Sequence, residues 1–286
     1  MKKIIIIFFA AMMSLTAFSQ TDSVKAEVLR PVTSAYTLEA GFARVTDTYL
    51  SPLKYTGLTA AFGYERLQAM KFSPENWIMQ LRLNVGMDYM ENPAKNVDMW
   101  GFGGNVSWGM QRRWQGVRCS GLNLSVGGST TLNLGALYST RNGNNPVSAK
   151  ASWTADLTCM ATYSFRIKSL PVTVRYQPTL PLIGAFFSPE YDQLYYEIYK
   201  GDSDGVVHFA QPFCYFYLDN LLTADFRFGA TSLRIGYHGT VTSTEAHHLV
   251  CNMATHSFVV GISGEWLSLS PGRKISEETR IISAYY

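Results

Sequence analysis

The residue types best suited to catalysis stand near the C-terminal end of the chain. His238 is followed by Thr240 two positions later, and Asn252 lies further downstream. A hydroxyl nucleophile needs a base within hydrogen-bond reach and a third group that orients the base. The catalytic candidates are therefore Thr240 as nucleophile, His238 as base and Asn252 as orienting residue. An alternating strand would also place His238 and Thr240 on one face without any catalytic purpose.

Three further histidines raise the question of a metal site. His247 and His248 are adjacent and His256 follows, but neighbouring residues of a strand point to opposite faces. Only Glu245 and Cys251 stand near ligand spacing. We therefore expect no metal and no cofactor.

The four cysteines are widely separated and form no Cys-x-x-Cys pair. We interpret them as ordinary buried or lipid-facing thiols, and the spacing leaves a disulfide open without predicting one.

Charged residues of both signs share one parity of the alternating segments. If these segments form a barrel with a polar interior, the candidates to line the lumen are Glu39, Glu65, Arg82, Asp88, Lys150, Asp156, Arg166, Arg175, Asp219, Asp225, Arg227, Arg234 and Glu265. Buried charges are tolerated only when they are paired and hydrogen-bonded. Since the two signs are nearly balanced, we expect pairs across the lumen and an occluded interior. A narrow channel for small polar solutes is the alternative.

The elements that carry these residues are predicted to be long β-strands. From Ala149 to Ile167 every odd position is apolar, and Met160 is the only apolar residue at the even positions. This period of two indicates a strand, and no helix produces it. The segment is also longer than a typical globular strand, as outer-membrane strands are.

The same pattern recurs along the chain. The predicted strands are 34–46, 54–68, 76–90, 98–113, 118–137, 149–168, 171–187, 213–228, 232–243 and 248–267. This gives an all-β fold, an antiparallel up-and-down transmembrane β-barrel of about ten strands, an even number as expected for bacterial barrels. If 188–212 or the C-terminal tail adds strands, the number becomes 12. Tight turns are expected at 169–170 and 230–231, and outer loops at 139–148 and 188–212.

Alternation alone does not say which face is wet, since a soluble barrel would bury its apolar face. Three features favour a membrane barrel. Charged residues are 16% of the chain while aromatics are 14%, and the polar parity is mostly Gly, Ser, Thr and Asn where a wetted sheet would carry Lys and Glu. Aromatic residues near the strand ends also fit an interfacial girdle.

The N-terminus has the features of an export signal. Lys2 and Lys3 precede an apolar run that is too short to span a membrane, and small residues follow at Ala17 and Ser19. We expect a signal peptide at 1–19, a periplasmic lead at 20–33, the barrel at 34–267, and at 268–286 a tail or a final strand. The expected location is the bacterial outer membrane.

Two resemblances add to this interpretation. The segment Asp-Thr-Tyr-Leu-Ser-Pro-Leu-Lys-Tyr-Thr-Gly at 47–57 resembles a motif of a domain-of-unknown-function family of Bacteroidota-type exported barrel proteins. The segments 233–239 and 256–261, and Gln20 after the cleavage site, resemble the same group. The family implies no activity, and 47–57 is expected to be an outer hairpin loop.

The order of His238, Thr240 and Asn252 resembles the His-x-Ser and downstream Asn of outer-membrane phospholipase A, which implies a lipid hydrolase. Thr replaces Ser, and the flanking sequence differs from that enzyme. We therefore expect a non-enzymatic barrel with a structural or interaction role, with the channel and the hydrolase as alternatives. Its expected partners are outer-membrane lipid and other envelope proteins at 139–148 and 188–212. We expect a monomer, and a net charge of +3 gives no reason to expect nucleic acid.

Overall fold

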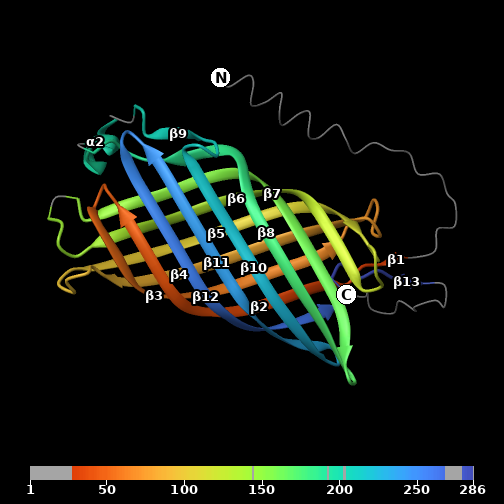
Figure 1. The fold of residues 1–286 in the computed structure, drawn as a ribbon. Helices are drawn as coiled ribbons and strands as arrows, with labels where there is room; N and C mark the ends of the chain where they lie inside the picture. The colour runs from red at the N-terminus through yellow and green to blue at the C-terminus, as the bar shows by residue number, and fades with distance from the viewer. Residues whose placement is uncertain (1–27, 144, 192, 202–203, 268–278, 286) are drawn as a thin grey trace, which may run out of the picture.

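The computed structural model describes residues 28–143, 145–191, 193–201, 204–267 and 279–285. Its main element is one sheet of long antiparallel strands that curls into a barrel (Figure 1). The barrel strands are β2 (Val32–Asp47), β3 (Ser51–Ala69), β4 (Trp77–Glu91), β5 (Asp98–Trp114), β6 (Leu122–Ser139), β7 (Val147–Ile167), β8 (Leu170–Phe187), β10 (Tyr215–Phe228), β11 (Thr231–Ala246) and β12 (Leu249–Trp266).

The barrel is closed. β12 pairs with β2 from Trp266↔Val32 to Cys251↔Asp47, and β10 pairs with both β8 and β11. Closure leaves no free sheet edge, which is the condition for strands to cross a lipid bilayer. The predicted all-β fold and its ten strands are confirmed.

The two ends of the barrel differ in their connections. At the end where β2 begins and β12 stops, which we call the terminal rim, the connections are 70–76, 115–121, 168–169 and 229–230. At the opposite end, the loop rim, they are 48–50, 92–97, 140–146, 188–214 and 247–248. The longest connection therefore lies at the loop rim, where Figure 1 shows α2 and β9 beside the strand ends.

The outer surface of the barrel is apolar, as the alternation predicts. Leu38 and Phe42 of β2 are 68% and 69% exposed, and Phe258 and Ile262 of β12 are each 58% exposed. Soluble proteins rarely expose contiguous apolar surface on this scale, whereas a lipid-facing belt requires it. In the part of the chain that the structure describes, no helix is long and apolar enough to span a membrane.

Most predicted strand boundaries differ from the structure by a few residues, and some of the differences have a visible cause. β6 begins at Leu122 and not at 118, because Arg118 and Gly121 adopt positive φ angles of 65° and 98° in the turn before it. The tight turns are 168–169 and 229–230, each one residue earlier than predicted. The segment 47–57 is mostly strand, and only 48–50 connect β2 to β3.

Short elements complete the described chain. α2 (Tyr195–Lys200) and β9 (Val207–Ala210) belong to the long connection at the loop rim. β1 (Val28–Leu29) pairs in parallel with β13 (Arg280–Ile281). β13 stands in a separate two-stranded sheet, so the described part of the tail adds no barrel strand. The predicted signal peptide lies outside the described residues.

Candidate functional site

Most of the predicted lumen residues are enclosed by the barrel. Seven are buried: Glu39, Glu65, Asp156, Arg175, Asp219, Asp225 and Arg234. Five are partly buried: Arg82, Asp88, Lys150, Arg227 and Glu265. Arg166 differs, because it lies exposed near the terminal rim. Four of the buried charges, Glu65, Arg175, Asp225 and Arg234, lie in the half of the lumen nearer the terminal rim.

A carboxylate held by two guanidinium groups crosses this half of the lumen. Glu65 of β3 accepts hydrogen bonds from Nη1 of Arg175 on β8 and from Nη1 of Arg234 on β11, each at 2.6 Å. Arg234 also donates from Nε and Nη2 to Asp225, at 2.7 and 2.8 Å. β3 and β8 are five steps apart in a ring of ten strands, so the Glu65–Arg175 pair joins opposite walls.

Side-chain amides fill the next layer. Gln80 donates to Glu65 at 2.7 Å, and its carbonyl accepts from Gln177 at 2.8 Å and from Gln111 at 2.9 Å. All three glutamines are buried. This layer satisfies polar atoms that would be costly to bury alone.

A second set of charges lies nearer the loop rim. Nη1 of Arg82 on β4 donates to Asp219 on β10 at 3.2 Å, again between opposite walls. His238 of β11 lies between two carboxylates, with Nδ1 2.7 Å from Glu39 and Nε2 3.3 Å from Asp219. Asn84 also donates to Glu39, at 3.1 Å. The lumen is thus crossed by ion pairs at two levels.

The C-terminal tail closes the terminal rim. Tyr285 is 2% exposed, and its ring centre lies 5.4 Å from the guanidinium carbon of Arg175 and 5.6 Å from that of Arg234. Such stacking of a guanidinium on a ring is attractive. Arg113 donates to the carbonyl oxygen of Ser283 at 2.7 Å. The tail is therefore bound by the same arginines that hold Glu65.

Apolar packing reinforces this closure. Ala284 and Tyr285 form one buried cluster with Leu67, Ile78 and Met160, from β3, β4 and β7. We call the tail residues Ser283 to Tyr285 the terminal plug. The plug and the Glu65 network together fill the terminal half of the lumen.

The loop half of the lumen is built differently, because it contains a cavity of about 230 Å³. Three glycines on neighbouring strands, Gly86, Gly103 and Gly135, stand in register and line one wall. Ala61 continues this row on β3 and Lys150 ends it on β7. The absence of side chains along the row makes room for the cavity.

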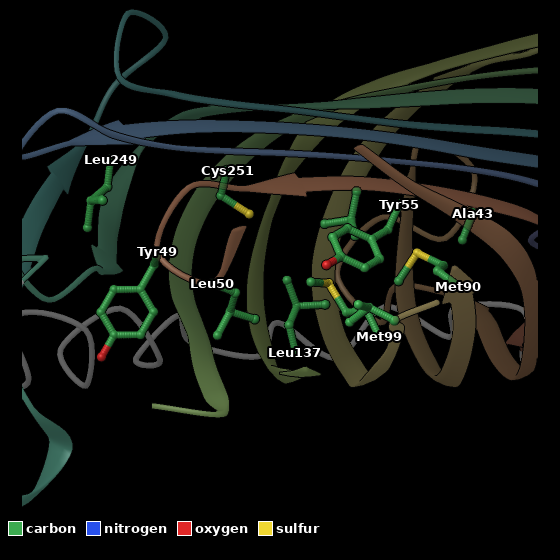
Figure 2. Close-up of a cluster of buried hydrophobic side chains, with 11 residues drawn as sticks. Ala43, Tyr49, Leu50, Tyr55, Met90, Met99, Leu137, Leu249 and Cys251 are labelled. Carbon is green, nitrogen blue, oxygen red and sulfur yellow. The ribbon is translucent and has the colours of Figure 1, made fainter. Parts of the chain in front are cut away.

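Two groups of larger side chains and the polar layer complete the cavity. Its apolar end is lined by Leu137, Cys251 and Met253, which belong to or pack on the buried cluster shown in Figure 2. An aromatic wall is formed by Phe186, Tyr215 and Tyr217, and Glu39 and His238 form the polar floor.

The connection 48–50 folds into the mouth of the barrel instead of forming an outer loop. Tyr49 and Leu50 are buried, and Nζ of Lys150 lies 2.8 Å from Asp47 at the end of β2. Tyr49 donates to the carbonyl oxygen of Gln193 at 3.3 Å, and its ring centre lies 6.1 Å from that of Tyr195 on α2. Burial, with further effects of Tyr195 and Asp47, raises the pKa of Tyr49 to about 12.

The structure does not bring the catalytic candidates together. Both ring nitrogens of His238 face carboxylates, so neither is free to take a proton from Thr240. The hydroxyl of Thr240 is hydrogen-bonded to that of Thr255 at 2.7 Å. Asn252 is exposed on the outward parity of β12, between the lumen-facing residues Cys251 and Met253. The expected hydrolase triad of Thr240, His238 and Asn252 therefore does not form in this structure.

The other histidines and the cysteines are also dispersed. His256 lies on the outer surface, beside the hydroxyl of Tyr237. His247 and His248 form the β11–β12 turn with positive φ angles. No group of three or more His, Cys, Asp or Glu side chains among the described residues could hold a metal ion. All four cysteines are free, Cys119 being exposed and Cys251 buried.

Sequence reasoning missed several residues of the lumen. Asp47 and Arg113 lie on the inward parity near strand ends. The predicted strand 34–46 ends one residue before Asp47. Arg113 is the last residue of the predicted strand 98–113, and its inward parity was the signal that could have placed it in the lumen. The inward parity also carries the apolar residues Val45, Met90 and Met99, which form the buried cluster near the loop rim. The parity of these three residues predicts that they face the lumen, whereas their apolar side chains are typical of the lipid-facing surface.

Comparison with known proteins gives a family but no activity. No curated protein matches the sequence. Similar solved structures include the outer membrane protease OmpT from Escherichia coli (7% identity, TM-score 0.40, covering 86% of this chain and 99% of that chain). Another is the transport unit of the autotransporter AIDA-I from Escherichia coli (8% identity, TM-score 0.42, covering 91% of this chain and 97% of that chain). A third is the translocator domain of the autotransporter NalP from Neisseria meningitidis (11% identity, TM-score 0.37, covering 90% of this chain and 93% of that chain). Residues 4–273 match the family described as "Protein of unknown function (DUF3316)".

Proposed function

Because the chain belongs to the DUF3316 family, whose description assigns no activity, we propose a function from the geometry of the barrel. The protein is an outer-membrane barrel with a sealed lumen, and it acts through contacts at its loop rim and not by conducting solutes. The observation that carries this proposal is the bridging of opposite walls by Glu65–Arg175 and Arg82–Asp219.

The energetics of these pairs support a permanently closed lumen. Separating a buried ion pair leaves charges without partners, at a cost of about 3–5 kcal/mol for a single broken pair. A path along the lumen would have to separate both levels and displace the terminal plug. A ten-stranded barrel is narrow enough for side chains to obstruct it, whereas porins have 16–18 strands.

The outer surface and the rims support location in the outer membrane. The apolar belt matches the lipid-facing surface of known barrel architecture. The connection 188–214 at the loop rim is far longer than any connection at the terminal rim, which fits an extracellular loop rim and a periplasmic terminal rim. In this orientation the terminal plug faces the periplasm. The N-terminal charges and apolar run support export through a cleaved signal peptide. The mature chain recovered from membranes should then begin at Gln20.

The long connection at the loop rim is the proposed contact surface. Tyr191, Tyr196 and Tyr199 are 69%, 66% and 83% exposed. Tyrosine is enriched at protein interfaces because it combines a large apolar area with a hydroxyl group. Other envelope proteins are the proposed partners, with the connection 140–146 as an additional contact, and the barrel itself is proposed to be a monomer. Deletion of 189–212 should abolish the co-purification of such partners.

Conductance measurement tests the sealed lumen directly. Full-length mature protein inserted into planar bilayers should give no discrete current steps, while a porin inserted under the same conditions should. Stable unitary steps from the unaltered protein would refute the proposal. Heat-modifiable migration on a gel shows in the same samples that the barrel is folded.

A narrow channel is the second candidate, and one observation favours it. The terminal plug is held by hydrogen bonds, ring stacking and apolar packing, so it can leave without any covalent bond being broken. A channel of this kind would conduct only after the plug leaves. Current steps that require removal of residues 279–286 would favour this candidate.

The source of the protein is inferred from its sequence. We infer a Bacteroidota-type exported protein, supported by the motif at 47–57 and by Gln20 directly after the expected cleavage site. The motif also has a structural role, because its first residue, Asp47, pairs with Lys150 and its Tyr49 is buried.

A further inference from the structure

The loop-half cavity contains a carboxylate whose charge is not neutralised by a partner. Asp88 of β4 lines the cavity and stands in register between Thr59 and Gly101. Its Oδ2 lies over Gly101, only 2.7 Å from the position that a Cβ would take there. Among the described residues, Asp88 takes part in no ion pair, unlike the other charged residues of the cavity.

The remaining charges around the cavity are already satisfied. Lys150 is paired with the buried carboxylate of Asp47. Glu39 is hydrogen-bonded by Asn84 and lies against His238, whose other nitrogen faces Asp219. The cavity therefore has one unbalanced negative charge, at Asp88. A ligand that neutralises this charge is a cation. An anion would find no free positive charge in the cavity, because Lys150 is paired with Asp47.

The shape and lining of the cavity restrict the cation further. A volume of about 230 Å³ is below the roughly 300–1,000 Å³ of pockets for drug-sized ligands, so the ligand is small. Phe186, Tyr215 and Tyr217 line the cavity, on β8 and β10, while Asp88 is on β4. Aromatic faces attract both apolar groups and cations.

We propose that this cavity is a binding site for a small organic ammonium compound. The ammonium group pairs with Asp88, and the apolar body occupies the space left by Gly86, Gly103 and Gly135, against the aromatic wall. The site lies on the loop-rim side of the charged layers, so a ligand can occupy it without separating the ion pairs that cross the lumen. It is therefore independent of whether the lumen conducts.

Three probes of nearly equal shape test the charge requirement. Benzylamine, benzyl alcohol and benzoate are titrated calorimetrically into the full-length mature protein in detergent, with an empty-micelle titration subtracted. Benzylamine should bind at least tenfold more tightly than benzyl alcohol, and benzoate should give no saturable heat. Equal binding of the three probes, tighter binding of benzoate, or no saturable binding of benzylamine would overturn the proposal.

Variants separate the site from unspecific uptake. Asp88→Asn keeps the shape and should abolish the tenfold preference for benzylamine over benzyl alcohol. Gly103→Val fills the cavity and should abolish saturable binding, and it is tolerated because the nearest atom to its Cβ is 3.4 Å away. The matched control is Gly128→Val, an outward position on β6 with its nearest atom at 3.8 Å, which should bind like the unaltered protein.

Each variant is first checked for heat-modifiable migration, so that only folded protein is titrated. Benzylamine affinity unchanged in Asp88→Asn would place the probe elsewhere and refute the site. Planar-bilayer conductance is measured separately. Absence of ligand binding would therefore refute this site but not the sealed lumen, and current steps would refute the sealed lumen but not this site.

Discussion

The two halves of the lumen are filled in opposite ways. In the terminal half, large charged side chains from opposite walls meet, and Glu65 contacts two arginines at 2.6 Å. In the loop half, glycines in register withdraw from the lumen and leave a cavity beside Asp88. Because the strands are continuous through both halves, the difference comes from the strand side chains and from the C-terminal tail. A barrel can thus be packed in one half and hold a cavity in the other without any change in its wall.

The strongest test of this contrast exchanges a carboxylate in each half. Glu65→Gln leaves the buried guanidinium of Arg175 without a counter-charge and leaves Arg234 with Asp225 alone, so it should lower the free energy of unfolding by about 3–5 kcal/mol. Asp88→Asn removes a carboxylate that has no ion pair, and should change stability by less than about 1 kcal/mol. Urea unfolding of the two variants in lipid vesicles measures both values. Equal losses would mean that the halves do not differ in the way described.

The terminal plug gives the next largest effect. Tyr285→Ala removes a buried ring and its stacking on two arginines, and should cost about 3 kcal/mol. The control is Tyr199→Ala, because Tyr199 is 83% exposed and should contribute almost nothing. Thermal or urea unfolding compares the two. A Tyr285 variant as stable as the control would show that the tail does not hold the terminal half together.

Filling the loop half should have the opposite sign. Gly103→Val adds apolar volume in the cavity and removes a flexible glycine from a strand, so it should raise the free energy of unfolding by about 1 kcal/mol. Gly101→Val should instead destabilise the barrel, because its Cβ would meet Oδ2 of Asp88 at 2.7 Å. The unfolding midpoints of the two valine variants test whether the cavity lies beside Gly103, as in the structure. Two losses of similar size would argue against a cavity at Gly103.

The smallest effect concerns the loop rim at alkaline pH. Tyr49 has a pKa of about 12 in the folded protein against an ordinary value of 10, so its contribution to stability is complete below pH 10. As the pH rises from 10 through 12, the unfolded chain ionises first and this contribution is lost. Tyr49→Phe should flatten the decline of unfolding free energy over that range. Absorbance near 295 nm follows tyrosinate in parallel, and the variant should lose one late-titrating group.

The sequence predicted the wall of this barrel better than its contents. Residues such as Trp153 and Asp156 reveal their faces through a period of two, and period alone places ten strands. Which lumen residues meet is a different matter, because Glu65 and Arg175 are brought together by closure of the ring and by no local pattern. For the same reason, the sequence does not show that Asp88 and Asp156 differ from acids such as Glu65, which form ion pairs across the lumen.

The tail and the cavity were beyond prediction on similar grounds. A terminal tyrosine has no periodicity to place it, and its position depends on Arg175 and Arg234 already being fixed. The glycine row depends on register across three strands. A shift of one residue would have moved Gly103 to the outer face.

The sequence separation of the Glu65 network has a consequence for the order of folding. Its pair with Arg234 joins positions 169 residues apart, and Arg113 holds Ser283 across 170 residues. Hairpins between neighbouring strands can form early, whereas contacts this distant form slowly because a long loop must be closed first. The network and the tail contact therefore assemble late, together with the closure of β12 on β2. Protection of the Tyr285 amide against hydrogen exchange would time the docking of the tail.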